Sequence, residues 1–219
     1  MSLILASSSP FRKAILERLG VSFITVSPNI DETRKTPEKP YDLVYRLAEE
    51  KAKEVAKTHS GLIIASDQVA TLGSGNEEGD EILNKPLTHK NAFAQLQKSS
   101  GRTVTFLTSI ALLNTETEIL QNHVEFFRVF FKSLSDHHIL SYLEKEDVLN
   151  CAGSFKSEGL GATLINRMEG NDPNSLIGLP TIQLTIMLAK EMFISYKYFT
   201  VSTTPIPTTY PIKCVLNVY

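Results

Sequence analysis

The chain has 219 residues, of which 42% are hydrophobic and 21% are charged, and its formal net charge at pH 7 is −2. A chain of this length buries about 70% of its unfolded surface, so it can form a core without disulfides or structural metals. Because there is no large excess of positive charge, we expect nucleic acid not to be a main partner.

The chain contains only two cysteines, too few for a disulfide framework or a zinc site built from thiolates. We expect Cys151 and Cys214 to be buried free thiols in a reducing compartment. The N-terminal "MSLILASSS" has an apolar run too short for a secretory signal, and no stretch reaches the roughly 18 apolar residues of a membrane span. The sequence therefore predicts a cytoplasmic protein that does not enter a membrane.

The first predicted elements are a strand, a turn and a helix. Residues 3–6 form an apolar run typical of a strand. A helix is expected over residues 10–19, with Ser9 as its N-cap, Pro10 in its first turn and Gly20 at its end.

The turn before this helix has the composition of a phosphate site. Ser7 and Ser9 offer hydroxyls, the helix start offers unpaired N–H groups, and Arg12 and Lys13 add positive charge. The alternative is an ordinary strand followed by a capped helix, which many α/β proteins contain, and the glycines of a Walker loop are absent. Both interpretations stay open on these residues alone.

A second helix is expected over residues 41–58, and it leads into the apolar run "GLIIASDQVATL". The run breaks at Ser66 and Asp67, which predicts that the strand ends there. Asp67 would then lie where open α/β sheets place catalytic groups, and its carboxylate could bind a divalent cation or deprotonate water. A turn-forming aspartate is the alternative.

Other charged residues can complete such a site. Asp31 and Glu32 in "NIDET" are oxygen ligands of the kind that Mg²⁺ prefers, and Lys51 and Lys85 can neutralise phosphate oxygens. Taken singly, each of them is better explained as a solvated surface charge.

The second half of the chain continues the alternation of strands and helices. The pattern predicts a hairpin loop over 73–81, a helix over 88–101 capped by Thr88, strands over 102–114 and 120–134 with the latter covered on both faces, a helix from Ser135 to about Glu146, a short strand over 162–167 and a buried helix from Pro180. These elements predict a mixed α/β fold. We expect one domain over residues 1–195, followed by an extended Thr- and Pro-rich arm over 196–219.

Seven segments, in order from Leu3 to about Met192, together resemble the Maf family of nucleoside triphosphate pyrophosphatases: "LILASSSPFRK", "NIDET", "RLAEEKA", "IIASDQVA", "NKPLT", "CAGSFKSEGLG" and "LIGLP". The resemblance implies a two-lobed, inosine triphosphatase-like α/β fold with an elongated mixed β-sheet flanked by helices. It also implies metal-dependent hydrolysis of a nucleoside triphosphate to the monophosphate and pyrophosphate.

The resemblance implies roles for individual residues. Asp67 matches the family's proton acceptor, and the residues that match the polar set around the phosphates and a Mg²⁺ or Mn²⁺ ion are Ser7, Arg12, Glu32, Lys51 and Lys85. Asp67 is a further candidate ligand of that ion. Lys13 stands where the family often has an arginine, which keeps the charge but loses the bidentate fork. A homodimer is compatible with the family.

Phe11, Gln68 and Glu158 match the family positions that set base specificity, and the combination resembles the branch acting on 7-methyl-GTP. Methylation at N7 makes guanine a cation, which an aromatic ring attracts and a carboxylate neutralises. Phe11 can instead belong to a core stripe with Ile15 and Leu19. The alternatives are the same chemistry on dTTP, UTP or another modified nucleotide and, more distantly, a non-catalytic regulator of septum formation.

Overall fold

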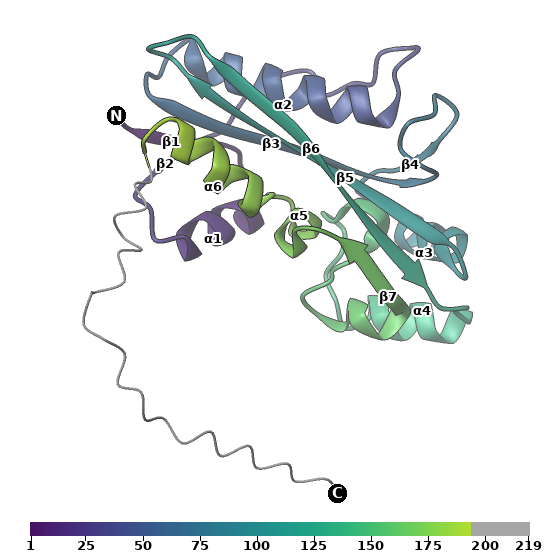
Figure 1. Cartoon of the computed structure of the whole chain (residues 1–219). Coiled ribbons are helices and arrows are strands. Elements are labelled where there is room, and N and C mark those ends of the chain that lie inside the picture. Colours follow the sequence, from purple (N-terminus) through teal and green to yellow (C-terminus); the bar gives the residue numbers. More distant parts are fainter. Residues whose placement is uncertain (194–219) are drawn as a thin grey trace, which may run out of the picture.

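The structure is a computed structural model that describes residues 1–193, so the predicted arm over 196–219 and Cys214 lie outside the described residues. A seven-stranded mixed sheet runs through it, with helices on both faces (Figure 1). In chain order the elements are β1 (Leu3–Ala6), α1 (Pro10–Arg18), β2 (Ile24–Val26), α2 (Pro40–Ala56), β3 (Leu62–Leu72), β4 (Glu81–Leu83), α3 (His89–Ser99), β5 (Thr103–Asn114), β6 (Leu120–Phe131), α4 (Asp136–Leu143), the 3₁₀ turns Ala152–Ser154 and Leu160–Leu164, β7 (Ile165–Gly170), α5 (Pro173–Ile177) and α6 (Thr181–Lys190).

The strands lie in the order β2-β1-β3-β5-β6-β7, and the short β4 pairs with β3. β1 runs parallel to β2 and β3, whereas the other neighbours pair antiparallel. The strands β3, β5 and β6 have 11, 12 and 12 residues and extend from one end of the molecule to the other (Figure 1). The predicted mixed α/β fold with an elongated mixed sheet is thereby confirmed.

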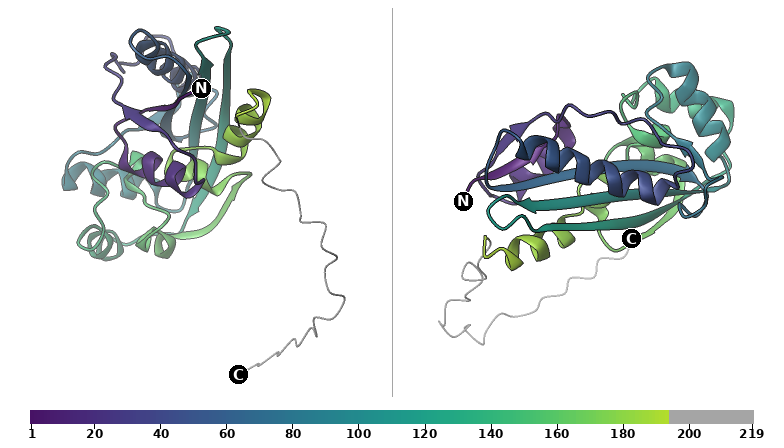
Figure 2. Two further views of the ribbon diagram at one scale, coloured as in Figure 1. Left: turned by 90° about the vertical axis from the view of Figure 1, so that its left-hand side faces the viewer. Right: turned by 90° about the horizontal axis from the view of Figure 1, so that it is seen from above.

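Helices cover the two faces of the sheet around β1, which explains why this strand is apolar throughout. Successive side chains of a strand point to opposite faces, so Ile4 packs with α2 on one face and Leu5 packs with α1 and α6 on the other (Figure 2). At the far end of the long strands, α3 and α4 enclose a separate core that contains Phe106 and Phe127. These two groups of elements correspond to the two lobes expected.

The predictions based on capping residues are confirmed. The Ser9, Thr88 and Ser135 side chains each accept a hydrogen bond from a first-turn amide of the helix that follows, which satisfies one of its unpaired N–H groups. The helix after Ser135 ends at Leu143, earlier than the expected Glu146.

The predicted break at Ser66 and Asp67 is wrong, because β3 continues to Leu72. Both polar residues find partners inside the sheet: the Ser66 hydroxyl donates to the Gly178 carbonyl (2.8 Å), and the Asp67 amide donates to the Ser109 hydroxyl (3.1 Å). Buried polar groups with such partners do not end a strand. Asp67 therefore lies in the middle of a strand and not at its end.

Three other expectations need correction. The segment 162–167 is a 3₁₀ turn up to Leu164, and its strand begins only at Ile165. β6 is not covered on both faces along its length, since Arg128 is exposed between buried neighbours. Likewise α6 is buried on one side only, with Ile182 and Ile186 exposed to solvent.

Phe106 is 1% exposed and anchors the core beneath α3, where its ring lies 6.1 Å from that of Phe155. We expect Phe106→Ala to lower the free energy of unfolding by about 3–5 kcal/mol, because the cavity it leaves cannot fully collapse. Urea unfolding followed by circular dichroism measures the loss, and Phe106→Leu serves as the milder control. A loss below about 1 kcal/mol would contradict this view of the core.

Within residues 1–193, no helix is both long enough and apolar enough to cross a membrane.

Cys151 is a half-buried free thiol, so it is less buried than expected.

Candidate active site

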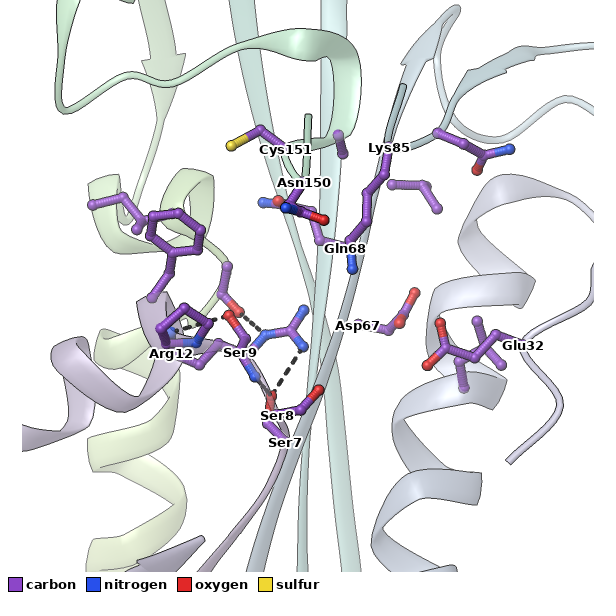
Figure 3. Close-up of a pocket in the computed structure, with 18 of the residues that line it drawn as sticks. Ser7, Ser8, Ser9, Arg12, Glu32, Asp67, Gln68, Lys85, Asn150 and Cys151 are labelled. Atoms are coloured by element: carbon purple, nitrogen blue, oxygen red, sulfur yellow. Dashed lines mark hydrogen bonds between the residues drawn. The ribbon is translucent and has the colours of Figure 1, made fainter. Parts of the chain in front are cut away.

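A cleft of about 540 Å³ opens where β1 leads into α1, beside the middle of β3 (Figure 3). This volume is typical of a site for a small molecule. Of the predicted site residues, the cleft is lined by Ser7, Ser9, Phe11, Arg12, Glu32, Lys51, Asp67, Gln68, Lys85 and Glu158. The fold thus brings together residues that are far apart in the chain.

Of the predicted site residues, Lys13 and the candidate metal ligand Asp31 do not line the cleft. Lys13 lies on α1. Its side chain is 54% exposed, and its ammonium lies 3.8 Å from the Glu17 carboxylate one turn further along α1. Each residue of a helix is rotated by about 100° from the one before, and at Lys13 this rotation carries the side chain past the cleft, to the side of Glu17. The structure therefore places Lys13 outside the cleft, and its role in phosphate binding stays a prediction.

Arg12 is held by the turn of residues 7–9 before α1 and by the turn that ends α5. Its Nη1 lies 3.4 Å from the Ser7 hydroxyl, which also accepts from the Ser9 amide (3.1 Å), and its Nε donates to the Gly178 carbonyl (2.8 Å). Gly178 ends α5 with a φ of +115°, a conformation that favours glycine. The same carbonyl accepts from Ser66, so this turn fixes the guanidinium, which points into the cleft (Figure 3).

Lys51 bridges the two candidate acidic residues. Its Nζ lies 2.6 Å from Asp67 Oδ1 and 2.8 Å from Glu32 Oε1. The side chains of Lys51 and Asp67 are buried, because α2 packs along β3, whereas the Glu32 side chain is 56% exposed. Lys51 is therefore not the surface lysine that its sequence environment alone suggested.

Burial and charge shift the pKa values of the groups in the cleft. Burial raises the pKa of Asp67, and the charges of Lys51 and Arg12 offset this only in part. Burial alone would also raise the pKa of Glu32, but the hydrogen bond and charge of Lys51 lower it on balance. Burial lowers the pKa of Arg12, against the attraction of Asp67 and Glu32. Asp67 is thus the carboxylate whose pKa moves toward neutrality, as a general base requires.

The two carboxylates suit a divalent cation that is also bound by a ligand's phosphates. Glu32 and Asp67 both contact one cation, the Lys51 ammonium, so their oxygens already converge. Within residues 1–193 no cluster of three or more acidic, histidine or cysteine side chains is arranged to hold a metal. Mg²⁺ is commonly bound by one or two carboxylates together with substrate phosphates, and the residues present fit that arrangement.

Phe11 and Gln68 occupy another part of the cleft. Ile15 and Leu19 pack in the core against α6, whereas Phe11 is half-buried and lines the cleft, so it is not a core residue. The Gln68 Nε2 donates to Thr108 Oγ1 (2.9 Å) and to two carbonyls of α5 (2.8 and 3.2 Å). These bonds leave the amide oxygen of Gln68 as the group available to a ligand.

Glu158 is exposed at the mouth of the cleft on the segment 156–160. Glu146, just beyond α4, holds this segment: its Oε1 accepts from the Leu160 amide (2.8 Å), and its Oε2 lies 3.2 Å from the Lys156 ammonium. The position of Glu158 thus depends on a carboxylate from another part of the chain.

The cleft is also lined by four residues that were not predicted to belong to the site: Asn150, Cys151, Lys156 and Gly178. The first three adjoin or lie within the quoted segment "CAGSFKSEGLG", and Gly178 lies in "LIGLP", so the family motifs were the available signal. Burial raises the pKa of Cys151 to about 11, which keeps its thiol neutral.

The chain is similar to known proteins both in sequence and, at a lower level, in structure. A curated relative from Pseudoalteromonas atlantica, named 7-methyl-GTP pyrophosphatase, is 52% identical over 190 residues, which cover 87% of this chain and 95% of the relative. A solved nucleoside-triphosphatase (dITP/XTP pyrophosphatase) from Mycobacterium abscessus has a TM-score of 0.44 and 17% identity, covering 88% of this chain and 95% of its own. The Staphylococcus aureus Ham1 protein has a TM-score of 0.43 and 12% identity, covering 61% and 73%. The family model for Maf-like proteins matches residues 2–191, and the chain therefore belongs to the Maf family.

Proposed function

We propose that this protein is a metal-dependent nucleoside triphosphate pyrophosphatase that hydrolyses 7-methyl-GTP to 7-methyl-GMP and pyrophosphate. The proposal rests on one observation: Asp67, Glu32 and Lys51 meet in one cleft with Arg12 and with the turn of residues 7–9 before α1, here called the serine turn. The 52% identity to a relative named 7-methyl-GTP pyrophosphatase supports the choice of substrate.

The triphosphate would bind across the serine turn and the lysines. The Ser7 and Ser9 hydroxyls lie at the start of α1, where the helix dipole favours an anion. Arg12, Lys51 and Lys85 supply positive charge around the cleft and would stabilise the charge that develops on the phosphate oxygens.

Glu32 and Asp67 would hold a Mg²⁺ or Mn²⁺ ion together with the phosphates. When bound, such an ion withdraws charge from the triphosphate. The Lys51 ammonium, which contacts both carboxylates in this structure, would turn to the phosphate oxygens once they enter.

Asp67 would act as the general base. Its carboxylate takes a proton from a water molecule, whose oxygen bonds to the α-phosphorus while the bond to the bridging oxygen breaks and pyrophosphate leaves. The raised pKa of Asp67, caused by burial, strengthens it as a base. The choice of the α-phosphorus rests on the family.

The base would be recognised by Phe11, Gln68 and Glu158, all of which line the cleft. An aromatic face attracts the cationic 7-methylguanine ring, and the Glu158 carboxylate can accept from its N1–H and amino group while offsetting the charge. Uracil and thymine carry no charge and would gain neither contribution.

We propose a cytoplasmic location for this activity, and the homodimer stays a prediction.

The substrate assignment is tested by measuring pyrophosphate release from 7-methyl-GTP, GTP, UTP and dTTP, with Mg²⁺, Mn²⁺ or a chelator. We expect metal-dependent release that is fastest with 7-methyl-GTP. Glu158→Gln should lower kcat/KM for 7-methyl-GTP by about 10-fold or more, because a charge-assisted hydrogen bond is lost, and should leave UTP unaffected. Glu144→Gln, which removes an exposed carboxylate outside the cleft, is the matched control.

Each other result has a clear meaning. Release only from the pyrimidine nucleotides would retain the chemistry and refute the base pocket. Equal kcat/KM values on UTP and 7-methyl-GTP would refute the specificity alone. If no nucleotide is cleaved, the non-catalytic alternative, a regulator of septum formation, becomes the better hypothesis.

A further inference from the structure

The segment that carries Glu32 has no helix or strand of its own. Residues 27–39 connect β2 to α2 as an irregular loop, and the Glu32 side chain is 56% exposed. A metal ligand must keep its position to bind well, and packing around Glu32 does not supply this. Other contacts must therefore hold the loop.

Arg46 makes more of these contacts than any other residue outside the loop. Its Nε and Nη2 bind the two carboxylate oxygens of Glu38 (2.6 and 2.9 Å), and Nη2 also donates to the carbonyl of Thr33 (3.2 Å), the residue after Glu32. Its Nη1 donates to Glu50, one turn further along α2 (2.9 Å). One guanidinium thus ties both ends of the segment 33–38 to α2.

The loop is further closed by bonds within itself that converge on Glu38. The Glu38 carboxylate accepts from the Lys35 amide (3.0 Å), and its carbonyl accepts from Arg34 Nε (2.7 Å). On the other side of Glu32, the Asp31 carboxylate accepts from the Thr33 amide (2.9 Å). Removing the Glu38 carboxylate or Arg46 would therefore free the backbone next to Glu32, while Arg34 and Lys35 keep their contacts with Glu78 and Glu50.

The Glu38–Arg46 pair is built differently from the exposed ion pairs of α2. The Glu38 and Arg46 side chains are 8% and 17% exposed and meet in a bidentate fork, whereas Lys53 in its pair with Glu49 is 58% exposed. Bidentate pairs shielded from solvent fix geometry, while exposed pairs contribute little. The hydrogen bond from Arg46 also lowers the pKa of Glu38, so the pair is charged at neutral pH.

We infer that Arg46 and Glu38 are positioning residues, which hold Glu32 where it binds the divalent cation. The inference rests on the proposed function, because it takes Glu32 as a metal ligand. α2 then has two functions in the site: Lys51 contacts Glu32 directly, and Arg46 holds the backbone from which Glu32 extends. The Glu38–Arg46 pair would affect the metal requirement and not the binding of the nucleotide.

The test compares the variants Arg46→Met, Arg46→Lys, Glu38→Gln, the double variant E38Q/R46M and, as reference, Glu32→Gln. Lys53→Met is the matched control, since it removes an exposed ion pair on the same helix. Mn²⁺ binding is measured by electron paramagnetic resonance, for the protein alone and with the α,β-methylene analogue of 7-methyl-GTP, so that no turnover is needed. Kinetics then give the half-saturating Mn²⁺ concentration and the nucleotide KM at saturating Mn²⁺.

We expect Arg46→Met and Glu38→Gln each to weaken Mn²⁺ binding by about 10-fold or more, the usual effect of losing an outer partner of a metal ligand. The nucleotide KM at saturating Mn²⁺ should stay within about twofold, and Lys53→Met should change neither value. Since the contact between Glu38 and Arg46 is lost in either single variant, the double variant should weaken Mn²⁺ binding no more than the worse single variant does. The Mn²⁺ affinity of Arg46→Lys should lie between those of the wild type and Arg46→Met, because an ammonium keeps the charge but cannot form the bidentate fork.

Two results would overturn the inference. If Glu32→Gln weakens Mn²⁺ binding but Arg46→Met and Glu38→Gln do not, the positioning role is wrong and the proposed function stands. If Arg46→Met raises the nucleotide KM as much as the Mn²⁺ requirement, the pair supports the fold in general and not Glu32. A lack of effect from Glu32→Gln itself would instead refute the metal assignment in the proposed function, and the positioning role with it.

Discussion

Replacing Asp67 with asparagine is expected to lower kcat by about 10³-fold, within the range that a general base contributes, and to leave the protein folded. An amide cannot take a proton from water, yet it has the size of the carboxylate and fits the same place in β3. The fold should survive because Lys51 keeps Glu32 as a partner at 2.8 Å. Pyrophosphate release at saturating 7-methyl-GTP and Mn²⁺ measures the loss of activity.

Two measurements make the result of Asp67→Asn specific. Circular dichroism and thermal unfolding should match the wild type, because the lower cost of burying a neutral amide offsets the loss of the ion pair with Lys51. Asp147→Asn, which changes an exposed carboxylate outside the cleft, should keep normal activity. Near-normal turnover by Asp67→Asn would remove Asp67 from its role as base.

Lys51→Met is expected to lower kcat by about 10²-fold or more at pH 7 and to change the pH profile. Asp67 is almost fully buried, and burial raises its pKa. Among the charges that lower this pKa, Lys51 has the largest effect. Removing a positive charge beside a carboxylate raises its pKa, whether or not a metal is bound. The lost ammonium also no longer stabilises the developing charge on the phosphates.

The direction of the pH effect follows from the active form of Asp67. The base works as a carboxylate, so the rate rises as pH increases through its pKa, and a higher pKa moves this acidic limb to higher pH. The kcat/KM–pH profile reports the free enzyme, in which Lys51 contacts Asp67, so the profile of Lys51→Met should lie to the alkaline side of the wild-type profile. Lys57→Met, which removes an exposed lysine paired with Glu54, serves as control. An unshifted limb would show that Lys51 does not tune Asp67.

The helix starts could be predicted from the sequence because their signals are local. Ser9, Thr88 and Ser135 each bond to an amide of the helix that directly follows, so a few neighbouring residues contain the whole cause. The apolar run over residues 3–6 likewise predicted a strand, and β1 occupies these residues.

The site residues were found through motifs, and the structure then decided which of them share one cleft. Arg12 and Lys13 are adjacent and both cationic, but the helix turns one toward the cleft and the other toward Glu17. Phe11 could have been a core residue with Ile15, and the packing of α1 places it in the cleft instead. The catalytic, specificity and metal roles of these residues stay predictions.

The sequence by itself determined the family, the set of candidate residues and the order of the longer helices and strands, since these depend on local patterns and motifs. It did not predict the short elements β2, β4 and α5. Only the tertiary structure decided that β3 continues through Asp67, because the partners of Ser66 and Asp67 come from Gly178 and Ser109, far along the chain. It also decided that Lys51 is buried between two carboxylates and that Arg46 holds the loop of Glu32. Burial and charge pairing arise from contacts between distant segments, which no local pattern encodes.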